Sequence, residues 1–253
     1  MATSHRRRVS KANDAASQTE RAVLALREIL LRGDFAAGQR LTELTLVARL
    51  GASRTPVRHA LNRLAHEGLL EELPAGGFSV RQFTLADIWD AIEIRGVLEG
   101  TAARLAAERL VDDSELEPLR HQCRQMDTFE RLTIDSFAEY MDMNEAFHNA
   151  FVALSKSRML GRHLDQVKSL PFASPSAMVF PTSFLPKSDE TLAIALAQHR
   201  DIVEAIETRQ GTRAESIARE HAYVARHVLE RALSNTDALS RVPGGSLINV
   251  TPR

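Results

Sequence analysis

The stretch LVARLGASRTPVRHALNRL, residues 46–64, predicts two helices joined by a tight turn. Gly51 is expected to end the first helix, because glycine readily takes the left-handed backbone conformation found just past a helix end. Ser53 is expected to cap the second helix with its side-chain oxygen. Beyond Ser53 the apolar residues recur every three or four positions, which indicates an amphipathic helix with one buried face. These positions are Val57, Ala60, Leu61, Leu64 and Ala65.

The other face of this second helix is cationic. Arg54 and Arg58 lie one helical turn apart, and Pro56 is tolerated between them because an amide in the first turn has no intrahelical partner. A basic helix after a tight turn is typical of a helix-turn-helix, whose second helix places its N-terminal residues against base edges in the DNA major groove. By itself, the pattern also fits an ordinary amphipathic helix with a solvated basic face.

The residues that follow favour DNA binding. The sequence LLEELPAGGFSV predicts a strand over Leu69–Leu73, a turn over Pro74–Gly77 and a returning strand that contains Phe78. Two helices followed by a short hairpin form a winged helix-turn-helix. We expect Gly76 and Gly77, at the tip of the wing, to let the backbone approach the minor groove or the phosphates.

Three segments together resemble the DNA-binding domain of the GntR family of bacterial transcription regulators: RGDFAAGQRLTE, LVARLGASRTPVRHAL and EGLLEELPAGGFSV. The resemblance covers roughly residues 20–82. Ala37 is a small departure, since the family usually has proline before the glycine of that turn. The predicted DNA-binding residues are Arg49, Ser53, Arg54, Thr55, Arg58, Gly76 and Gly77.

Composition and charge fit a protein of two parts. The 253 residues suit one large domain or two small ones, and 44% hydrophobic residues are ample for real cores. Residues 1–82 hold 13 Lys and Arg against 8 Asp and Glu, whereas the remainder holds 19 against 25. This asymmetry fits a nucleic-acid-binding domain joined to a domain that binds something else.

The expected fold is mainly α, a winged helix-turn-helix of three helices and a short β-hairpin followed by an all-α helical bundle. The predicted segments are a flexible basic arm (1–16), the DNA-binding domain (17–82), an effector-binding and dimerisation bundle (84–233) and a flexible tail (234–253). In the arm, Arg6, Arg7 and Arg8 either touch phosphates or belong to a solvated tail. The single cysteine, Cys123, excludes an intrachain disulfide framework, and without an apolar run of about 18 residues the cytoplasm is the expected location.

The second domain places charged and polar residues where a buried face is expected. In the helix over about residues 85–108, Arg95 and Glu99 interrupt an apolar stripe. One interpretation is an ion pair between these two residues inside the domain. The other is that Arg95 offers its planar guanidinium to the carboxylate of a ligand. A proline-rich run at 170–189 cannot be one helix, and is either a lid or a plain connection.

Three predicted helices each bring a histidine to an inward face: His148, His199 and His221. Asn144 lies one turn before His148 on the same face. A single core histidine is usually structural. Three histidines on facing helices of one bundle meet the requirement of a metal site, because imidazole is a common ligand of Zn, Ni, Fe and Cu.

The segments NEAFH (144–148), HRDIVEAI (199–206) and AESIAREH (214–221) resemble the FCD effector domain of the FadR branch of GntR regulators, over roughly residues 84–233. Many members bind a divalent metal, such as Zn or Ni, through an aspartate and three histidines. The resemblance places these ligands at Asn144, His148, His199 and His221. The asparagine departs from the family pattern and implies a weaker site, because a neutral amide replaces a charged oxygen ligand. The alternative is a histidine cluster that contacts the effector directly.

The sequence as a whole predicts a ligand-responsive transcription regulator and not an enzyme. We expect a homodimer that binds a palindromic operator in double-stranded DNA, usually as a repressor in this family, and that responds to a small organic acid. The effector-binding residues would be Arg95, His148, His199 and His221. Rival interpretations are a metal-dependent enzyme that uses the three histidines and a constitutive DNA-binding protein with a vestigial pocket.

Overall fold

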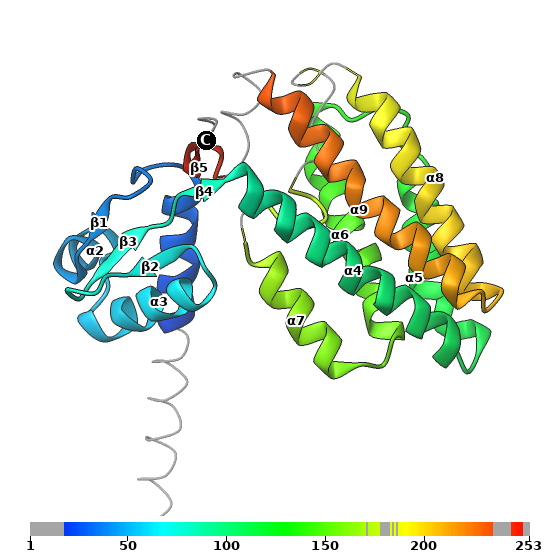
Figure 1. The fold of residues 1–253 in the computed structure, drawn as a ribbon, viewed down its shortest axis with the longest axis horizontal. Coiled ribbons are helices and arrows are strands. Elements are labelled where there is room, and N and C mark those ends of the chain that lie inside the picture. Colours follow the sequence, from blue (N-terminus) through cyan, green and yellow to red (C-terminus); the bar gives the residue numbers. More distant parts are fainter. Residues whose placement is uncertain are drawn as a thin grey trace, which may run out of the picture. The chain divides into compact units, whose positions relative to one another are not determined.

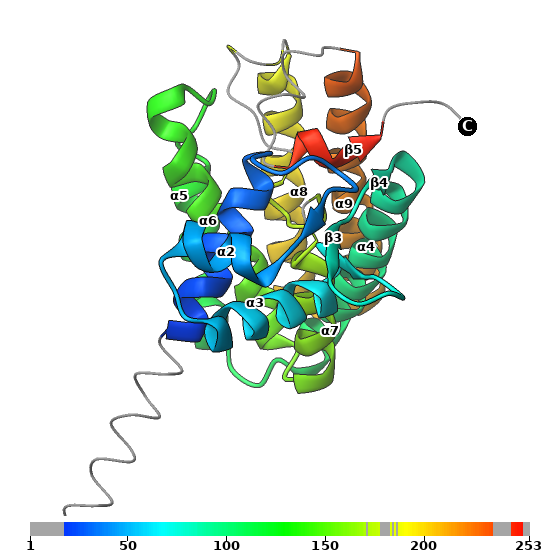
Figure 2. The ribbon, with the colours of Figure 1, turned by 90° about the vertical axis from the view of Figure 1, so that its left-hand side faces the viewer.

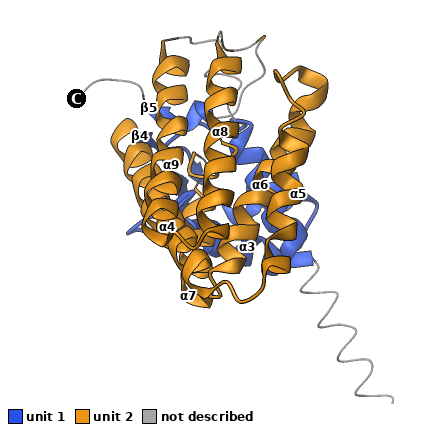
Figure 3. Cartoon of the chain, turned by 90° about the vertical axis from the view of Figure 1, so that its right-hand side faces the viewer, with its two compact units in different colours: residues 1–84, 243–253 blue, residues 85–242 orange. Residues whose placement is uncertain are grey.

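The computed structural model divides the chain into two compact units. Unit 1 comprises residues 1–84 and 243–253, and unit 2 comprises residues 85–242 (Figure 3). The structure describes residues 18–170, 172–177, 183, 185, 187–234 and 244–249. The predicted basic arm and most of the predicted tail therefore lie outside the described residues. Within the described ranges, no helix is both long and apolar enough to span a membrane.

The helix-turn-helix of unit 1 forms where the sequence predicts it (Figure 2). A first helix over residues 18–31 is followed by α2 (Glu43–Leu50) and α3 (Arg54–His66). Thr42 caps α2 by accepting a hydrogen bond from the Thr45 amide. Gly51 ends α2 with a φ of 60°, in the left-handed region that favours glycine, which confirms its predicted role.

The wing is a three-stranded antiparallel sheet. Its strands are β1 (Arg40–Leu41), β2 (Leu70–Glu72) and β3 (Phe78–Val80), in the order β1-β3-β2. The β2–β3 hairpin pairs Leu70 with Val80 and Glu72 with Phe78, as expected for a wing. Strand β1 was not predicted, because two residues are too short to show the alternation by which strands are recognised.

A second, two-stranded sheet in unit 1 includes residues of the segment that the sequence predicts as a flexible tail. After a short 3₁₀ turn, η2 (Gly245–Leu247), strand β5 (Ile248–Asn249) pairs in parallel with β4 (Phe83–Thr84). Leu247 is fully buried. Apolar burial and pairing with β4 hold this segment, which is too short to have a periodic pattern of its own.

Gly33, at the end of the first helix, lies beside this returning segment. Its φ is +80°, and a Cβ atom at this position would lie 2.6 Å from Ser246 Oγ. The Gly244 amide donates a hydrogen bond to the Leu31 carbonyl at 2.7 Å. The returning segment thus contacts the first helix as well as β4.

Unit 2 is an all-α bundle, as predicted (Figure 1). Its elements are α4 (Leu85–Arg109), η1 (Asp113–Leu116), α5 (Glu117–Met126), α6 (Ile134–Leu154), α7 (Arg158–Lys168), α8 (Ser188–Glu207) and α9 (Gly211–Leu233). A continuous hydrophobic core connects these helices and includes Cys123, which is buried as a small apolar side chain.

Helices α4 and α9 lie side by side at short distance (Figure 1). Two glycines of α4 allow this approach. A Cβ atom at Gly96 would lie 3.0 Å from the Cβ of Ala222, and one at Gly100 would lie 2.8 Å from the carbonyl oxygen of Glu215. This close packing brings α4, which carries Arg95 and Glu99, against α9, which carries His221.

Candidate DNA interface and histidine pocket

The recognition helix α3 has the two faces that the sequence predicts. Its apolar residues Val57, Ala60, Leu61 and Leu64 are fully buried. Arg54, Thr55 and Arg58 are exposed on the opposite side of the helix. The buried face attaches α3 to unit 1 and leaves a basic face at its N-terminal end, where helix-turn-helix proteins contact bases.

Two of the predicted DNA-binding arginines form ion pairs within unit 1. Arg58 Nε and Nη2 donate to the two carboxylate oxygens of Glu43 on α2, at 2.7 and 3.1 Å. Arg49 pairs with Asp34, and its guanidinium lies 5.0 Å from the centre of the Phe35 ring. Glu43 and Asp34 were missed as partners, because their contacts depend on how separate segments pack.

Ser53 occupies the predicted N-cap of α3, but it does not cap the helix with its side chain. Its backbone is extended, with a φ of −74° and a ψ of 166°, and its exposed hydroxyl makes no hydrogen bond to the first-turn amides. The predicted side-chain cap is wrong, because the side chain of Ser53 forms no cap hydrogen bond. The first turn of α3 thus lacks a side-chain cap, and helix N-termini in this state attract phosphate groups.

The tip of the wing is held by glycines and one arginine. Gly76 and Gly77 have φ values of 83° and 89°, which side chains other than glycine rarely adopt. Arg40 Nη2 donates to the Gly76 carbonyl at 2.9 Å. A Cβ atom at Gly76 would have no heavy atom within 4 Å, so the tip is open to an approaching surface.

Three histidines meet inside unit 2. His148 on α6, His199 on α8 and His221 on α9 are all buried, and one nitrogen of each ring lies within 4.8 Å of the other two. The Nε2 atoms of His199 and His221 are 3.1 Å apart. The prediction that three inward-facing histidines converge is confirmed. His163, on α7, is exposed and does not belong to this cluster.

The outward nitrogens of two of these rings have hydrogen-bond partners. His148 Nδ1 lies 3.0 Å from Glu99 Oε1, and His221 Nδ1 lies 2.9 Å from Gln198 Oε1. Within the described part of the chain, His148 Nε2 and His199 Nδ1 are buried without a partner. Glu99 and Gln198 were not foreseen as partners of histidines, because each is joined to its histidine only by helix packing.

Burial sets the charge of the cluster. It lowers the pKa of His199 well below the usual value and, with His148 nearby, lowers the pKa of His221 to about 3. Burial would raise the pKa of Glu99, but His148 and Arg95 outweigh it and lower this pKa to about 2. At neutral pH, His199 and His221 are therefore uncharged and Glu99 is ionised.

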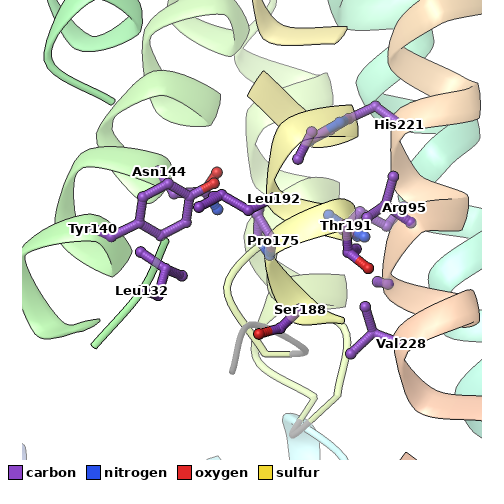
Figure 4. Close-up of a pocket in the computed structure, with 13 residues that line it drawn as sticks. Arg95, Leu132, Tyr140, Asn144, Pro175, Ser188, Thr191, Leu192, His221 and Val228 are labelled. Atoms are coloured by element: carbon purple, nitrogen blue, oxygen red, sulfur yellow. The ribbon is translucent and has the colours of Figure 1, made fainter. Parts of the chain in front are cut away.

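A pocket adjoins the cluster, and His221 is one of the residues that line it. In Figure 4, Arg95 and His221 lie on one side of it, and Tyr140 and Asn144 on the other. The remaining lining residues are mostly apolar: Leu132, Pro175, Ser188, Thr191, Leu192, Ala195, Val224, Ala225 and Val228. Pro175 belongs to the proline-rich run, so a described part of that run does border the pocket.

Asn144 has a partner of its own in this loop. Its Nδ2 donates to Ser176 Oγ at 3.1 Å, and Ser176 is itself buried. The side-chain amide thus has one defined orientation. This contact also fixes the described part of the loop against α6, because Ser176 Oγ in turn donates to the Met141 carbonyl at 3.3 Å.

Arg95 is 2% exposed and loosely held. Its Nη1 lies 3.4 Å from Glu99 Oε2, and its Nη2 lies 3.4 Å from the Ala222 carbonyl. Its Nε is buried and has no partner among the described residues. The predicted pair with Glu99 is present, and donor capacity remains on a guanidinium that borders the pocket.

A winged helix-turn-helix with a basic helix, joined to a helical bundle with a pocket beside three buried histidines, defines a DNA-binding regulator. Residues 18–80 match the model of the gntR family of bacterial regulatory proteins, and residues 90–233, more than half of the chain, match that of the FCD domain. The chain belongs to the gntR family and carries an FCD domain. It is a transcription regulator and not an enzyme, as its sequence predicted.

Individual relatives agree with this assignment. The chain is 37% identical over 126 residues to the Nta operon transcriptional regulator of Aminobacter aminovorans, a match that covers 50% of this chain and 58% of that protein. It is 30% identical over 206 residues to the "Probable D-xylose utilization operon transcriptional repressor" of Paenarthrobacter nicotinovorans, covering 81% and 85%. The structure of E. coli McbR/YncC shares the fold, with a TM-score of 0.55 and 23% identity over 83% of this chain and 97% of that chain.

Proposed function

We propose that unit 2 binds a small organic acid with the help of a divalent metal ion, Zn²⁺ or Ni²⁺, and that this binding changes the affinity of the protein for its operator. The observation that carries the proposal is the convergence of His148, His199 and His221 beside the pocket that Arg95 and Asn144 line. Buried nitrogens are normally hydrogen-bonded. Two nitrogens of this cluster have no partner among the described residues, which favours the binding of a ligand at this cluster.

The donor set fits a metal ion. His148 and His221 already use their outward Nδ1 atoms, so each keeps Nε2 for a ligand. His199 and His221 are uncharged at neutral pH, as metal-binding imidazoles have to be. When bound, the metal would supply a Lewis-acidic centre for a carboxylate oxygen. Asn144 would offer its amide oxygen, a weaker ligand than the aspartate that the family resemblance implies.

An organic acid fits the chemistry of the pocket. Arg95 has a buried guanidinium with unused donor capacity, and a guanidinium binds a carboxylate through two parallel hydrogen bonds. Apolar residues such as Leu132, Leu192 and Val228 also line the pocket and can contact the hydrocarbon part of the acid. A neutral polar ligand would leave the charge of Arg95 poorly compensated.

On the DNA side, we propose a homodimer on a palindromic operator. One winged domain reads only a few base pairs, so two-fold symmetry is the usual means of specifying a genomic site. The residues proposed to contact DNA are Arg49, Ser53, Arg54, Thr55, Arg58, Gly76 and Gly77. Repression is the proposed sign of regulation, since the Paenarthrobacter relative is named a repressor.

Metal content and thermal stability test the metal site. Protein purified without a chelating resin is expected to contain Zn or Ni, and added Zn²⁺ or Ni²⁺ should raise its melting temperature. Asn144→Asp should enlarge that rise by adding a negative charge beside the cation, whereas His221→Ala should abolish it. The matched control, His163→Ala, removes an exposed histidine and should respond like the native chain.

The competing arrangement, in which the histidines bind the acid without a metal, predicts a different result. Native protein and Asn144→Asp would then both be purified without metal, and added Zn²⁺ or Ni²⁺ would not change the melting temperature of either. In that case Asn144→Asp would also weaken the binding of an acid, because the new carboxylate would repel it.

A further inference from the structure

Glu99 lies at the centre of the buried charges of unit 2. It is 1% exposed and uses one oxygen for each of two partners: Oε1 lies 3.0 Å from His148 Nδ1, and Oε2 lies 3.4 Å from Arg95 Nη1. Among the described residues, the group able to share one metal ion consists of three histidines and does not include Glu99. Glu99 therefore contacts this group through His148.

This contact decides which nitrogen of His148 carries hydrogen. A carboxylate oxygen accepts hydrogen bonds, so the hydrogen of this contact is on His148 Nδ1, and Nε2 is the nitrogen left for a metal ion. Nε2 then keeps its lone pair. This atom is buried and has no partner in the part of the chain that the structure describes. The ring is thus held in the tautomer that a metal ion requires at Nε2.

From this geometry we infer that Glu99 positions His148 for a metal ion and supplies negative charge that the ligand set lacks; the inference rests on the metal site proposed above. Metal-bound histidines commonly donate their second N–H to a carboxylate, which fixes the ring and strengthens the metal bond. The effect is larger here than beside an aspartate ligand, because Asn144 and the three imidazoles carry no negative charge.

The two contacts of Glu99 are unequal. Its distance to His148 is ordinary for an N–H···O hydrogen bond, whereas its distance to Arg95 is near the outer limit of such bonds. Glu99 is therefore bound mainly to His148. Arg95 can consequently be changed while the Glu99–His148 contact is kept, and this makes the role of Glu99 testable.

Zn²⁺ titration of the metal-free, full-length chain provides the test. Glu99→Gln keeps the size of the side chain but removes its charge, and should weaken Zn²⁺ binding by about 10–100-fold. Arg95→Gln, the matched control, leaves Glu99 and His148 in contact and should not weaken it. Because Glu99→Gln leaves Arg95 buried without its carboxylate, the double variant Arg95→Gln/Glu99→Gln is compared with Arg95→Gln alone, and the same loss is expected.

A second readout follows the tautomer directly. In ¹⁵N NMR spectra of the metal-free native chain, His148 should carry its hydrogen on Nδ1 alone. The amide of Glu99→Gln can donate as well as accept. This variant should therefore show a mixture of the two neutral tautomers of His148, one with the hydrogen on Nδ1 and one with it on Nε2. Native protein that binds no Zn²⁺ overturns the metal site and this inference together. Zn²⁺ binding that is equal in the native chain and both Glu99→Gln variants, or a loss of equal size in Arg95→Gln, overturns the role of Glu99 alone.

Discussion

Arg58 and Glu43 form a two-point ion pair, with Nε on Oε1 at 2.7 Å and Nη2 on Oε2 at 3.1 Å. The pair connects the recognition helix α3 to α2. It also fixes the direction of a guanidinium that remains 65% exposed. A positioned guanidinium loses less side-chain entropy when it binds a base edge, so this contact bears on DNA affinity as well as on the fold.

Arg58→Ala is expected to weaken binding to the specific operator by about 1–3 kcal/mol if Arg58 makes a bidentate guanine contact. The measurement is a titration against a DNA site obtained by in vitro selection with the native protein. Arg213→Ala is the matched control, since Arg213 pairs with Glu204 in unit 2. Unchanged affinity in both Arg58→Ala and Arg54→Ala would refute the assignment of α3 as the reading helix.

Glu43→Gln should strengthen binding to non-specific DNA. The change removes a negative charge from the basic face and releases Arg58, so affinity for random DNA is expected to rise. The ratio of specific to non-specific affinity should fall, because Arg58 is no longer held in one orientation. Both affinities are measured at two salt concentrations. A fall in random-DNA affinity would show that Glu43 does not oppose phosphate binding.

Replacing both wing glycines by valine is expected to weaken operator binding. Positive φ values at Gly76 and Gly77 make a β-branched residue unfavourable, and the added side chains would hold the wing away from DNA. The domain should remain folded, because a Cβ atom at Gly76 meets no neighbour. Circular dichroism checks the fold. Gly76→Asn, which tolerates this backbone, should bind more like the native chain.

Unit 2 is expected to lose stability as the pH falls. The folded pKa of His221 is about 3 and that of His199 is also lowered, whereas both titrate near 6.5 in the unfolded chain. Between these values the unfolded state binds protons that the folded state excludes. The stabilising contribution is thus complete above pH 6.5 and declines below it, by about 1.4 kcal/mol per pH unit for each histidine.

Urea unfolding of chelator-treated protein between pH 7 and pH 5 measures this slope. The variant His163→Ala/His227→Ala removes two exposed histidines and should keep the native slope. His221→Gln should reduce it. Glu99 does not contribute to the slope between pH 7 and pH 5, because its carboxyl group does not titrate above pH 4.5 in the folded or the unfolded chain. If the slope of His221→Gln equals that of the native chain, burial of His221 does not cause the loss of stability at low pH.

Leu247→Ala is expected to destabilise unit 1 by about 2–5 kcal/mol, the usual cost of truncating a fully buried leucine. Hydrogen exchange of the α3 amides reports on this unit. Leu44→Ala is the control, because Leu44 is 71% exposed and its loss should change stability by no more than about 0.5 kcal/mol. Equal protection in the Leu247 variant would show that β5 does not support unit 1.

The sequence predicts those features that short segments determine by themselves. Helix α3 and the wing follow from local periodicity and turn residues, and His148, His199 and His221 converge because each lies on the apolar face of its own helix. The side-chain cap predicted at Ser53 does not form, because a preference for serine at the N-cap does not decide which rotamer the side chain adopts.

Features that depend on packing between distant segments were not predictable. The contact of Glu99 with His148 joins α4 to α6, and the pairing of β4 with β5 joins two segments that are separated in sequence by all of unit 2. In β5 and β1, two residues are too few to show a period. Such strands exist because a neighbouring strand supplies the hydrogen bonds, which a single sequence does not reveal.

The β4–β5 pairing sets an order of events during protein synthesis. Residues 18–80 leave the ribosome early and already contain the helix-turn-helix and the wing. Strand β4 follows them, but β5 is made only after all of unit 2. Since chains grow from the N-terminus, β4 remains without this partner while unit 2 is translated and folds. Completion of unit 1 is therefore postponed until unit 2 has been made.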